Sequence, residues 1–243
     1  MTFAEIMYKG FLGYYLENNS TESGFVFFSL ITLGILVLSV GSYFLGSLNF
    51  AIIISKLVYK EDIRNHGSGN AGMTNMLRTY GKLPAACTLL ADALKAVVSV
   101  LIGRLIFGSI GAYMAGLACV LGHIFPFFYR FKGGKGVVVA FVTVFMTNWR
   151  VGLILLAFFV ILVAGTKYVS LGSVMCALVY PLLLSRMLKG DPIIVQLFSV
   201  VLAVIIVVKH KDNIMRLIRG EENKISFKRK NKENDSNDAG SDA

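Results

Sequence analysis

Long apolar runs separated by short polar segments make up most of the chain. The first run, residues 25–55, carries no charge, and one continuous helix of that length would overrun a hydrocarbon core of roughly 30 Å. We therefore expect this helix to tilt, bend or reach the membrane surface. Its glycines are the candidate bends, namely Gly34, Gly41 and Gly46.

Four further apolar segments are long enough to cross a bilayer, and they lie at 84–104, 105–129, 168–185 and 192–208. The first two follow each other directly, so a turn near 104–111 should separate them. Two other segments, 136–149 and 151–166, are individually short for spans and are split by the triplet Asn148, Trp149 and Arg150. They form either one helix or a short hairpin.

The positions of lysine and arginine decide between these two alternatives. Basic residues cluster in 56–83, in 130–135 and most densely in 209–232, and such loops face the cytoplasm. Only the hairpin gives an even number of crossings between the second cluster and the third. The pattern therefore predicts an all-α membrane protein, a bundle of about seven transmembrane helices with two short helices in the middle. The N-terminus lies outside and the C-terminus in the cytoplasm.

Composition agrees with a membrane protein surrounded by lipid. Hydrophobic residues make up 56% of the chain, charged residues only 16%, and the mean hydropathy is +0.69. The formal charge of +10 resides between the apolar runs and at the C-terminus, without the motifs of nucleic-acid binding, so we expect no nucleic acid. Three widely spaced cysteines indicate buried thiols without a disulfide framework, namely Cys87, Cys119 and Cys176.

The chain divides into three regions. Residues 1–24 lack the basic start of a cleaved signal peptide and are expected to form an extra-cytoplasmic interfacial segment. Residues 25–209 form the transmembrane domain. Residues 210–243 form a basic and polar cytoplasmic tail, disordered after about residue 228 because of its Lys, Asn, Asp and Ser bias.

The first cytoplasmic loop combines glycines with polar and basic residues. Its glycines match a G-x-G-x-x-G pattern, but the neighbours are membrane helices instead of the strands of a dinucleotide-binding fold. It is either an ordinary glycine-rich turn or a nest of backbone N–H groups that binds phosphate. The candidate phosphate ligands are Arg64, Gly67, Ser68, Gly69, Asn70, Gly72, Thr74, Asn75 and Arg78.

The second loop repeats this composition at 130–136, with Gly133, Gly134 and Gly136 around Lys135. Its sequence does not satisfy the Walker pattern, so nucleotide hydrolysis is not supported. It is either a basic anchor at the membrane surface or a second anion site. Two such loops on one membrane face indicate two phosphate groups or one phosphate enclosed from both sides.

Isolated polar residues in the apolar segments have alternative interpretations. Asp92 and Lys95 share a helix face and form either a structural ion pair or a support for the glycine loops, and His123 is most simply a packing residue. No histidine spacing suits a metal, so we predict no metal site. Ser170 and Ser173 are most simply N-cap residues, and His210 belongs to a solvated helix end. Ser47, within the first helix, is most simply a small packing residue.

Between about 44 and 226 the chain resembles the bacterial acyl-phosphate-dependent glycerol-3-phosphate acyltransferases. The resemblance is carried by Gly46-Ser47, Asp62-Ile63-Arg64 with the 67–75 loop, 77–79 with Gly81-Lys82, Asp92-Ala93-Leu94-Lys95, 122–126, 131–136, and 210–213 followed by Arg216-Leu217. It implies a seven-helix enzyme with a cytoplasmic active site. That enzyme would transfer an acyl group from acyl phosphate to glycerol 3-phosphate, giving lysophosphatidic acid and phosphate.

The resemblance also implies roles for individual residues. Ser47, Lys135, His210 and Asn213 are expected to be critical, together with one of Ser170 and Ser173, while the loop from Gly67 holds glycerol 3-phosphate. Lys56 stands where the family often has arginine, which puts that role in doubt because lysine lacks the bidentate fork. We expect no cofactor, a monomer, and a functional link to the enzyme that makes acyl phosphate.

Two other classes of protein would share some of these features. A transporter for a phosphorylated solute would place basic glycine loops at its inner opening, but no internal repeat is evident. A protein whose loops only bind anionic headgroups would tolerate Gly→Ala changes in the first loop. The enzyme would instead require more glycerol 3-phosphate after such changes.

Overall fold

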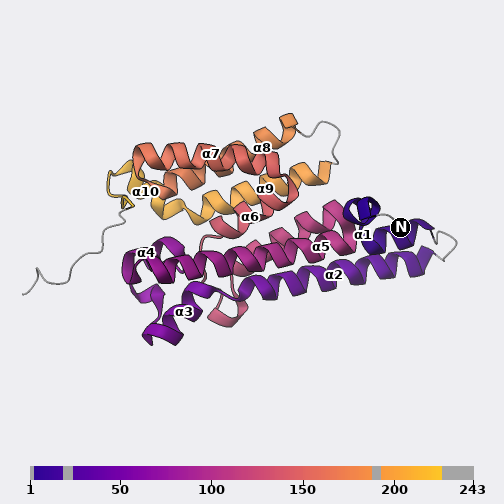
Figure 1. Ribbon diagram of the computed structural model, residues 1–243, viewed down its shortest axis with the longest axis horizontal. Coiled ribbons are helices and arrows are strands. Elements are labelled where there is room, and N and C mark those ends of the chain that lie inside the picture. The colour runs from indigo at the N-terminus through magenta and orange to yellow at the C-terminus, as the bar shows by residue number, and fades with distance from the viewer. Residues whose placement is uncertain (1–2, 19–23, 188–192, 226–243) are drawn as a thin grey trace, which may run out of the picture.

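The protein is an elongated helical bundle in the computed structural model, which describes residues 3–18, 24–187 and 193–225 (Figure 1). The segment expected to be disordered after residue 228 lies outside the described residues. Within them all regular structure is helical: α1 (Phe3–Asn18), α2 (Gly24–Ser47), α3 (Phe50–Tyr59), η1 (Ile63–Asn65), α4 (Met73–Tyr80), α5 (Lys82–Ile124), η2 (Phe127–Tyr129), α6 (Val137–Thr147), α7 (Trp149–Thr166), α8 (Val169–Met187), α9 (Ile193–Lys209) and α10 (Lys211–Ile218).

The first apolar run is broken, as its length requires, but none of the three glycines is the bend. Helix α2 ends at Ser47 and α3 begins at Phe50, where the side chain of Asn49 accepts a hydrogen bond from the Ile52 N–H and caps α3. Gly46 lies inside α2 for a different reason: a Cβ atom there would come within 2.2 Å of the Cys119 carbonyl oxygen. The break places the end of α2 beside the polar loops.

Helix α5 is a hairpin of two antiparallel halves. The chain reverses at 107–108, where the glycine has φ +60°, in the left-handed region that suits glycine. The Ser99 hydroxyl donates to the Ala115 carbonyl (3.0 Å), and a Cβ on Gly103 would lie 2.2 Å from the Gly111 carbonyl oxygen. The turn predicted between the second and third apolar segments is therefore confirmed.

The two short central segments form separate helices, as the hairpin alternative requires. Asn148 breaks the chain between α6 and α7, and its side chain accepts a hydrogen bond from the Val151 N–H (3.1 Å). Gly152 packs directly on Phe145, so α7 folds back along α6. At eleven residues, α6 is about 17 Å long, shorter than a hydrocarbon core.

The described chain is a multi-pass membrane protein by its apolar helices. Four helical segments are long and apolar enough to cross a membrane, or five if the bent pair α9 and α10 counts as one span, and α5 is among the four. In Figure 1, α7, α8 and α9 lie together opposite α2 and α5, with α6 between the two groups. Helices α3, α4 and α10 gather at one end of the bundle, which positions the polar loops there.

The N-terminal segment forms α1 at the opposite end of the bundle (Figure 1). The chain turns within α1 at Gly10, where φ is +76°, and a Cβ there would lie 2.4 Å from the Ile106 carbonyl oxygen at the α5 turn. Gly34 of α2 leaves room for Leu12 and Phe107 in the same contact. The segment is thus packed against the bundle, and its place outside the membrane stays a prediction.

Candidate active site

A cavity of about 630 Å³ runs from the end of the bundle that carries the loops into the apolar helices. We call its polar end the polar chamber; it is lined by Ser68, Arg78, Lys135, Ser170, His210 and Asn213. We call its inner part the apolar arm; it is lined by residues of α6 to α9 that include Val144, Leu155, Cys176, Tyr180 and Leu202. Such a shape suits a ligand with an anionic head and a hydrocarbon chain.

One hydrogen-bond network joins side chains from three distant segments in the polar chamber. The Lys135 ammonium donates to the Asn213 carbonyl oxygen, and the Asn213 amide donates to Glu222 Oε1 (2.6 Å). The Ser170 hydroxyl donates to the same carboxylate oxygen (2.8 Å), while Arg216 Nε donates to Oε2 (2.8 Å). Glu222 is the common acceptor that fixes Asn213, and through it Lys135.

The charges of this network follow from burial and hydrogen bonding. Burial lowers the pKa of Lys135 to about 8, because the apolar surroundings disfavour its charged form. Burial raises the pKa of Glu222, but hydrogen bonds from Asn213 and Ser170 and the ion pair with Arg216 outweigh it and hold that pKa below its usual range. The chamber therefore has a partly buried cation whose charge depends on pH around pH 8.

Glu222 was missed by the sequence analysis, which assigned it to a basic and polar tail. The only available signal was an acidic pair, Glu221 and Glu222, inside an otherwise basic stretch. In the structure the segment after α10 folds back, and the Ile225 N–H donates to the Lys167 carbonyl (2.8 Å). That contact brings the carboxylate over the start of α8.

His210 and Ser173 also line the cavity, with different hydrogen bonds. His210 stands at the 58° bend between α9 and α10, and its Nδ1 donates to the Ile206 carbonyl (2.7 Å), so Nε2 is the nitrogen left for a ligand. The Ser173 hydroxyl donates to the Val169 carbonyl, so Ser170 is the serine that joins the network. Among the described residues no three His, Cys, Asp or Glu side chains group as a metal site.

The first glycine loop is shaped by Asn75 instead of by a ligand. Gly67 and Gly69 have φ of +59° and +71°, in the left-handed region. The buried Asn75 side chain accepts from the Ser68 N–H (2.9 Å) and donates to the His66 carbonyl (2.9 Å). The Asn75 oxygen and amide thus hold the loop; Asn75 also lines the cavity, and its expected contact with phosphate stays a prediction.

Both loops use their glycine amides internally. Four of these N–H groups donate to backbone carbonyls: Gly69 to His66, Gly72 to Asn70, Gly133 to Ile124 and Gly134 to His123. Gly133 and Gly134 press against His123, where a Cβ would lie 2.1 Å and 2.3 Å from its atoms. The nest of backbone N–H groups is thus not formed at these four amides. The cavity is lined instead by side chains of Ser68, Asn70, Thr74 and Arg78, together with Gly72 and Gly136.

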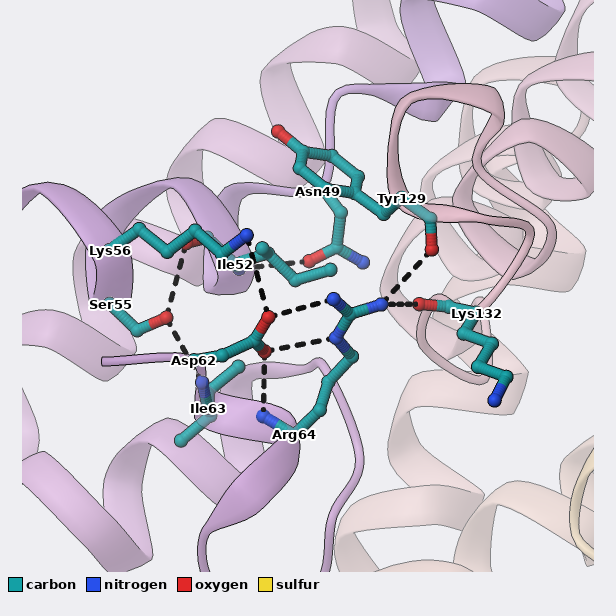
Figure 2. Close-up of polar contacts among 9 residues, drawn as sticks. All are labelled: Asn49, Ile52, Ser55, Lys56, Asp62, Ile63, Arg64, Tyr129 and Lys132. Atoms are coloured by element: carbon teal, nitrogen blue, oxygen red, sulfur yellow. Dashed lines mark hydrogen bonds and ion pairs between the residues drawn. The ribbon is translucent and has the colours of Figure 1, made fainter. Parts of the chain in front are cut away.

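Arg64 joins the two loops and lies outside the cavity lining. Figure 2 shows its guanidinium paired with Asp62 (2.7 Å and 2.9 Å) while Nη1 donates to the carbonyls of Tyr129 and Lys132, each at 3.0 Å. Lys56 approaches Asp62 at 3.6 Å and stacks its ammonium over the Tyr129 ring. In this arrangement Arg64 and Lys56 hold the loops together, and their expected role in binding phosphate stays a prediction.

This clamp predicts a loss of stability in acid. The hydrogen bond from Arg64 lowers the pKa of Asp62 to about 2, from 3.8. A depressed pKa stabilises the fold above pH 4, and that contribution, about 2 kcal/mol, disappears as pH falls from 4 towards 2. Thermal unfolding of the detergent-solubilised protein between pH 6 and 2 should show a larger loss in the wild type than in Asp62→Asn, which keeps only the acid dependence of other carboxylates such as Glu222. Equal pH dependence in both proteins would contradict the assignment.

The buried ion pair of α5 supports the break after α2. Lys95 Nζ bonds Asp92 (2.8 Å) and donates to the carbonyls of Gly46 (2.9 Å) and Leu48 (2.6 Å), which lack helical partners there. His123 Nδ1 lies 3.1 Å from the same ammonium. Asp92 and Lys95 therefore serve as a structural pair and as a support for the loop end of α2.

Ser47 is not brought together with Lys135. Its side chain is fully buried, donates to the Tyr43 carbonyl (2.9 Å) and accepts from the Phe127 N–H (3.3 Å). It is not among the residues that line the cavity. In this arrangement Ser47 fixes the turn at η2 to the end of α2, and its expected direct role in the reaction stays a prediction.

A multi-pass helical bundle with a cationic chamber that leads into an apolar arm is a membrane protein suited to an amphipathic anion. The profile of a family described as glycerol-3-phosphate acyltransferase matches residues 36–220. The chain belongs to this family of membrane acyltransferases, which confirms the resemblance seen in its motifs.

Individual relatives agree with this assignment. A glycerol-3-phosphate acyltransferase of Finegoldia magna is 43% identical over 194 residues, which cover 79% of this chain and 96% of the relative. One of Thermoanaerobacter pseudethanolicus is 42% identical over 187 residues, covering 77% and 93%. The solved structure of PlsY (YgiH), an integral membrane glycerol 3-phosphate acyltransferase in its glycerol 3-phosphate form, has 36% identity and a TM-score of 0.74, covering 79% of this chain and 96% of that one.

Proposed function

We propose that the protein transfers an acyl group from acyl phosphate to the 1-hydroxyl of glycerol 3-phosphate, releasing lysophosphatidic acid and inorganic phosphate. This would be the first acylation step of phospholipid synthesis. The observation that carries the proposal is the single cavity that joins the Lys135 network to the apolar arm. Both substrates bear a phosphate and one bears a long chain, so one cation-lined chamber and one apolar arm match them together.

The relatives support the same choice of ligands. The solved PlsY protein is described in a glycerol 3-phosphate form and in a lysophosphatidic acid form, the latter 35% identical to this chain with a TM-score of 0.71. Those ligands correspond to the proposed acceptor and the proposed product. The acyl donor follows from the motif resemblance and requires its own test.

In the proposed mechanism, Lys135 and Arg78 hold phosphate oxygens, while Asn213 and Ser170 position the reacting groups. The 1-hydroxyl oxygen attacks the acyl carbonyl carbon, and the bond from that carbon to the phosphate oxygen breaks. Acyl phosphate is already activated, so orientation and charge stabilisation can suffice. A substrate phosphate takes the hydroxyl proton; His210 Nε2 is the alternative acceptor.

The proposed topology has seven crossings, formed by α2, the two halves of α5, and α6 to α9. This count places the chamber at the same end as the three basic clusters, 56–83, 130–135 and the segment after 209. The active site would then face the cytoplasm, where glycerol 3-phosphate is dissolved. The enzyme that supplies acyl phosphate would act on the same face, and we expect the acyltransferase to work as a monomer.

The partly buried Lys135 predicts an alkaline limit to activity. Because Lys135 has a pKa of about 8 and must be protonated to hold phosphate, kcat/KM should fall as pH rises through 8. In Lys135→Arg the guanidinium keeps its charge, so the remaining activity should persist to higher pH. Initial rates between pH 6 and 10 would measure both limits. If kcat/KM of Lys135→Arg also fell near pH 8, the alkaline limit would arise from a group other than Lys135.

The decisive assay supplies purified protein in lipid with palmitoyl phosphate and glycerol 3-phosphate, and follows phosphate release and lysophosphatidic acid together. Equal amounts of both products, formed only when both substrates are present, would establish the reaction. Palmitoyl coenzyme A in place of palmitoyl phosphate tests the donor. Product formed from the thioester but not from acyl phosphate would overturn the proposed donor.

A further inference from the structure

We propose that the closed end of the apolar arm, formed by Val144, Leu155, Tyr180 and Leu202, sets the length of the acyl chain that the enzyme transfers. The inference rests on the proposed function, because the arm holds an acyl chain only if the substrate carries one. It adds a residue-level determinant of chain selection, and it concerns the end of the cavity farthest from the reacting groups.

The closed end is formed by one residue from each of four helices. Of the residues that line the cavity, Val144, Leu155, Tyr180 and Leu202 lie farthest along α6, α7, α8 and α9 from the polar chamber. Their exposed fractions are 4%, 5%, 4% and 5%, and all four belong to one hydrophobic cluster. The four side chains therefore pack together behind the cavity.

The depth of the arm follows from helix geometry. Along α8 the cavity is lined from Ser170 to Tyr180, ten residues or about 15 Å, and along α9 from His210 to Leu202, about 12 Å. Carbon–carbon bonds of about 1.5 Å in a zigzag advance about 1.25 Å each, so some ten to twelve carbons reach the closed end. Longer chains fit only if they bend or if the side chains of the closed end move.

The head of the arm coincides with the catalytic network. Ser170 begins the lined face of α8, Asn213 follows the end of α9, and Lys135 precedes α6. An acyl carbonyl held by these three side chains has its chain directed between α6, α8 and α9. The chain would then pass Cys176, which lies about 9 Å along α8 from Ser170.

Residues of α5 offer the chain a different path. Leu89, Leu90 and Ala93 also line the cavity, and Leu90 is 67% exposed, so a chain that passes it would reach the outer surface of the bundle. A chain that leaves there would lie in the bilayer and would not reach Tyr180. The two paths differ in their expected result. A chain in the closed arm makes kcat/KM depend on chain length and on the residues of the closed end, whereas a chain that leaves past Leu90 does not.

The test measures kcat/KM for saturated acyl phosphates of 8 to 18 carbons in the wild type and in variants of Cys176, Tyr180 and Leu178. Cys176→Phe blocks the arm midway, so palmitoyl phosphate should lose at least thirtyfold while octanoyl phosphate changes less than threefold. Tyr180→Ala deepens the arm, so kcat/KM for long chains should rise by about fourfold for each further methylene that becomes buried. Tyr180→Leu replaces it if the alanine variant does not fold.

Leu178→Phe is the matched control on α8. Leu178 is 51% exposed, so this variant should leave the dependence of kcat/KM on chain length unchanged.

A second readout does not depend on turnover. Cys87 is exposed and would react first, so it is replaced in a Cys87→Ser variant. In this variant a hydrophobic maleimide should modify Cys176, which lines the cavity, in preference to the buried Cys119. Palmitoyl lysophosphatidic acid should protect Cys176 at least tenfold, and the hexanoyl form should not. Absence of protection, or chain-length selection that responds to Leu90→Phe but not to Cys176→Phe, would overturn the inference. Failure of the proposed function is distinct, because the wild type would then turn over no acyl phosphate of any length.

Discussion

Lys135→Ala is expected to lower kcat/KM by about a thousandfold while the fold is retained. Lys135 is the partly buried cation at the junction of the chamber and the arm, and its ammonium donates to Asn213. Removing a preorganised charge from a site where negative charge moves between phosphate and carbonyl oxygens weakens binding of the transition state by about 3–4 kcal/mol. Phosphate release with palmitoyl phosphate and glycerol 3-phosphate measures the effect.

The matched control for this variant is Lys132→Ala in the same loop. The Lys132 side chain is exposed, and its backbone makes the contacts: the carbonyl accepts from Arg64 and the N–H donates to the Tyr129 carbonyl, so the alanine variant keeps both (Figure 2). Lys132→Ala removes one positive charge, as Lys135→Ala does, but its kcat/KM should stay within about threefold of the wild type. Equal losses in both variants would show that the loop acts through general positive charge, and the specific role of Lys135 would be refuted.

Glu222→Ala is expected to reduce both activity and stability. The carboxylate is 7% exposed and accepts hydrogen bonds from Asn213, Ser170 and Arg216. Without it these donors lose their common partner, at about 2–4 kcal/mol of unfolding free energy, and Asn213 no longer holds Lys135. We expect Tm to fall by at least about 5 °C and kcat by about a hundredfold.

Three measurements separate these effects of Glu222. Glu221→Ala removes the neighbouring exposed carboxylate and should leave Tm and kcat near wild type. Glu222→Gln keeps one acceptor oxygen and should recover part of the stability. Because the network positions Lys135, the alkaline limit of kcat/KM should also move in Glu222→Gln. If Glu222→Ala had the wild-type Tm and Glu222→Gln had an unchanged pH profile of kcat/KM, Glu222 would not be part of the active site.

Much of the architecture could be read from the sequence, since it depends on local properties of the chain. Long apolar runs in lipid must be helical, which predicted the apolar helices α2 and α5 to α9 and a turn near 104–111, found at 107–108. The break after Ser47 was expected from the excess length of the first run, although its position was not. The motifs identified Lys135, His210 and Asn213, and the cavity joins these three residues.

The tertiary structure decided how the polar residues are used. Arg64 and Asn75 look like phosphate ligands by residue type, yet their partners come from loops far along the chain or from a tight local fold, and these consume their hydrogen bonds. Glu222 carried no strong local signal because its function depends on donors 6 to 52 residues away. Apolar periodicity is a local property of a helix, whereas hydrogen-bond partnership depends on the positions of distant segments, and only the folded chain sets those.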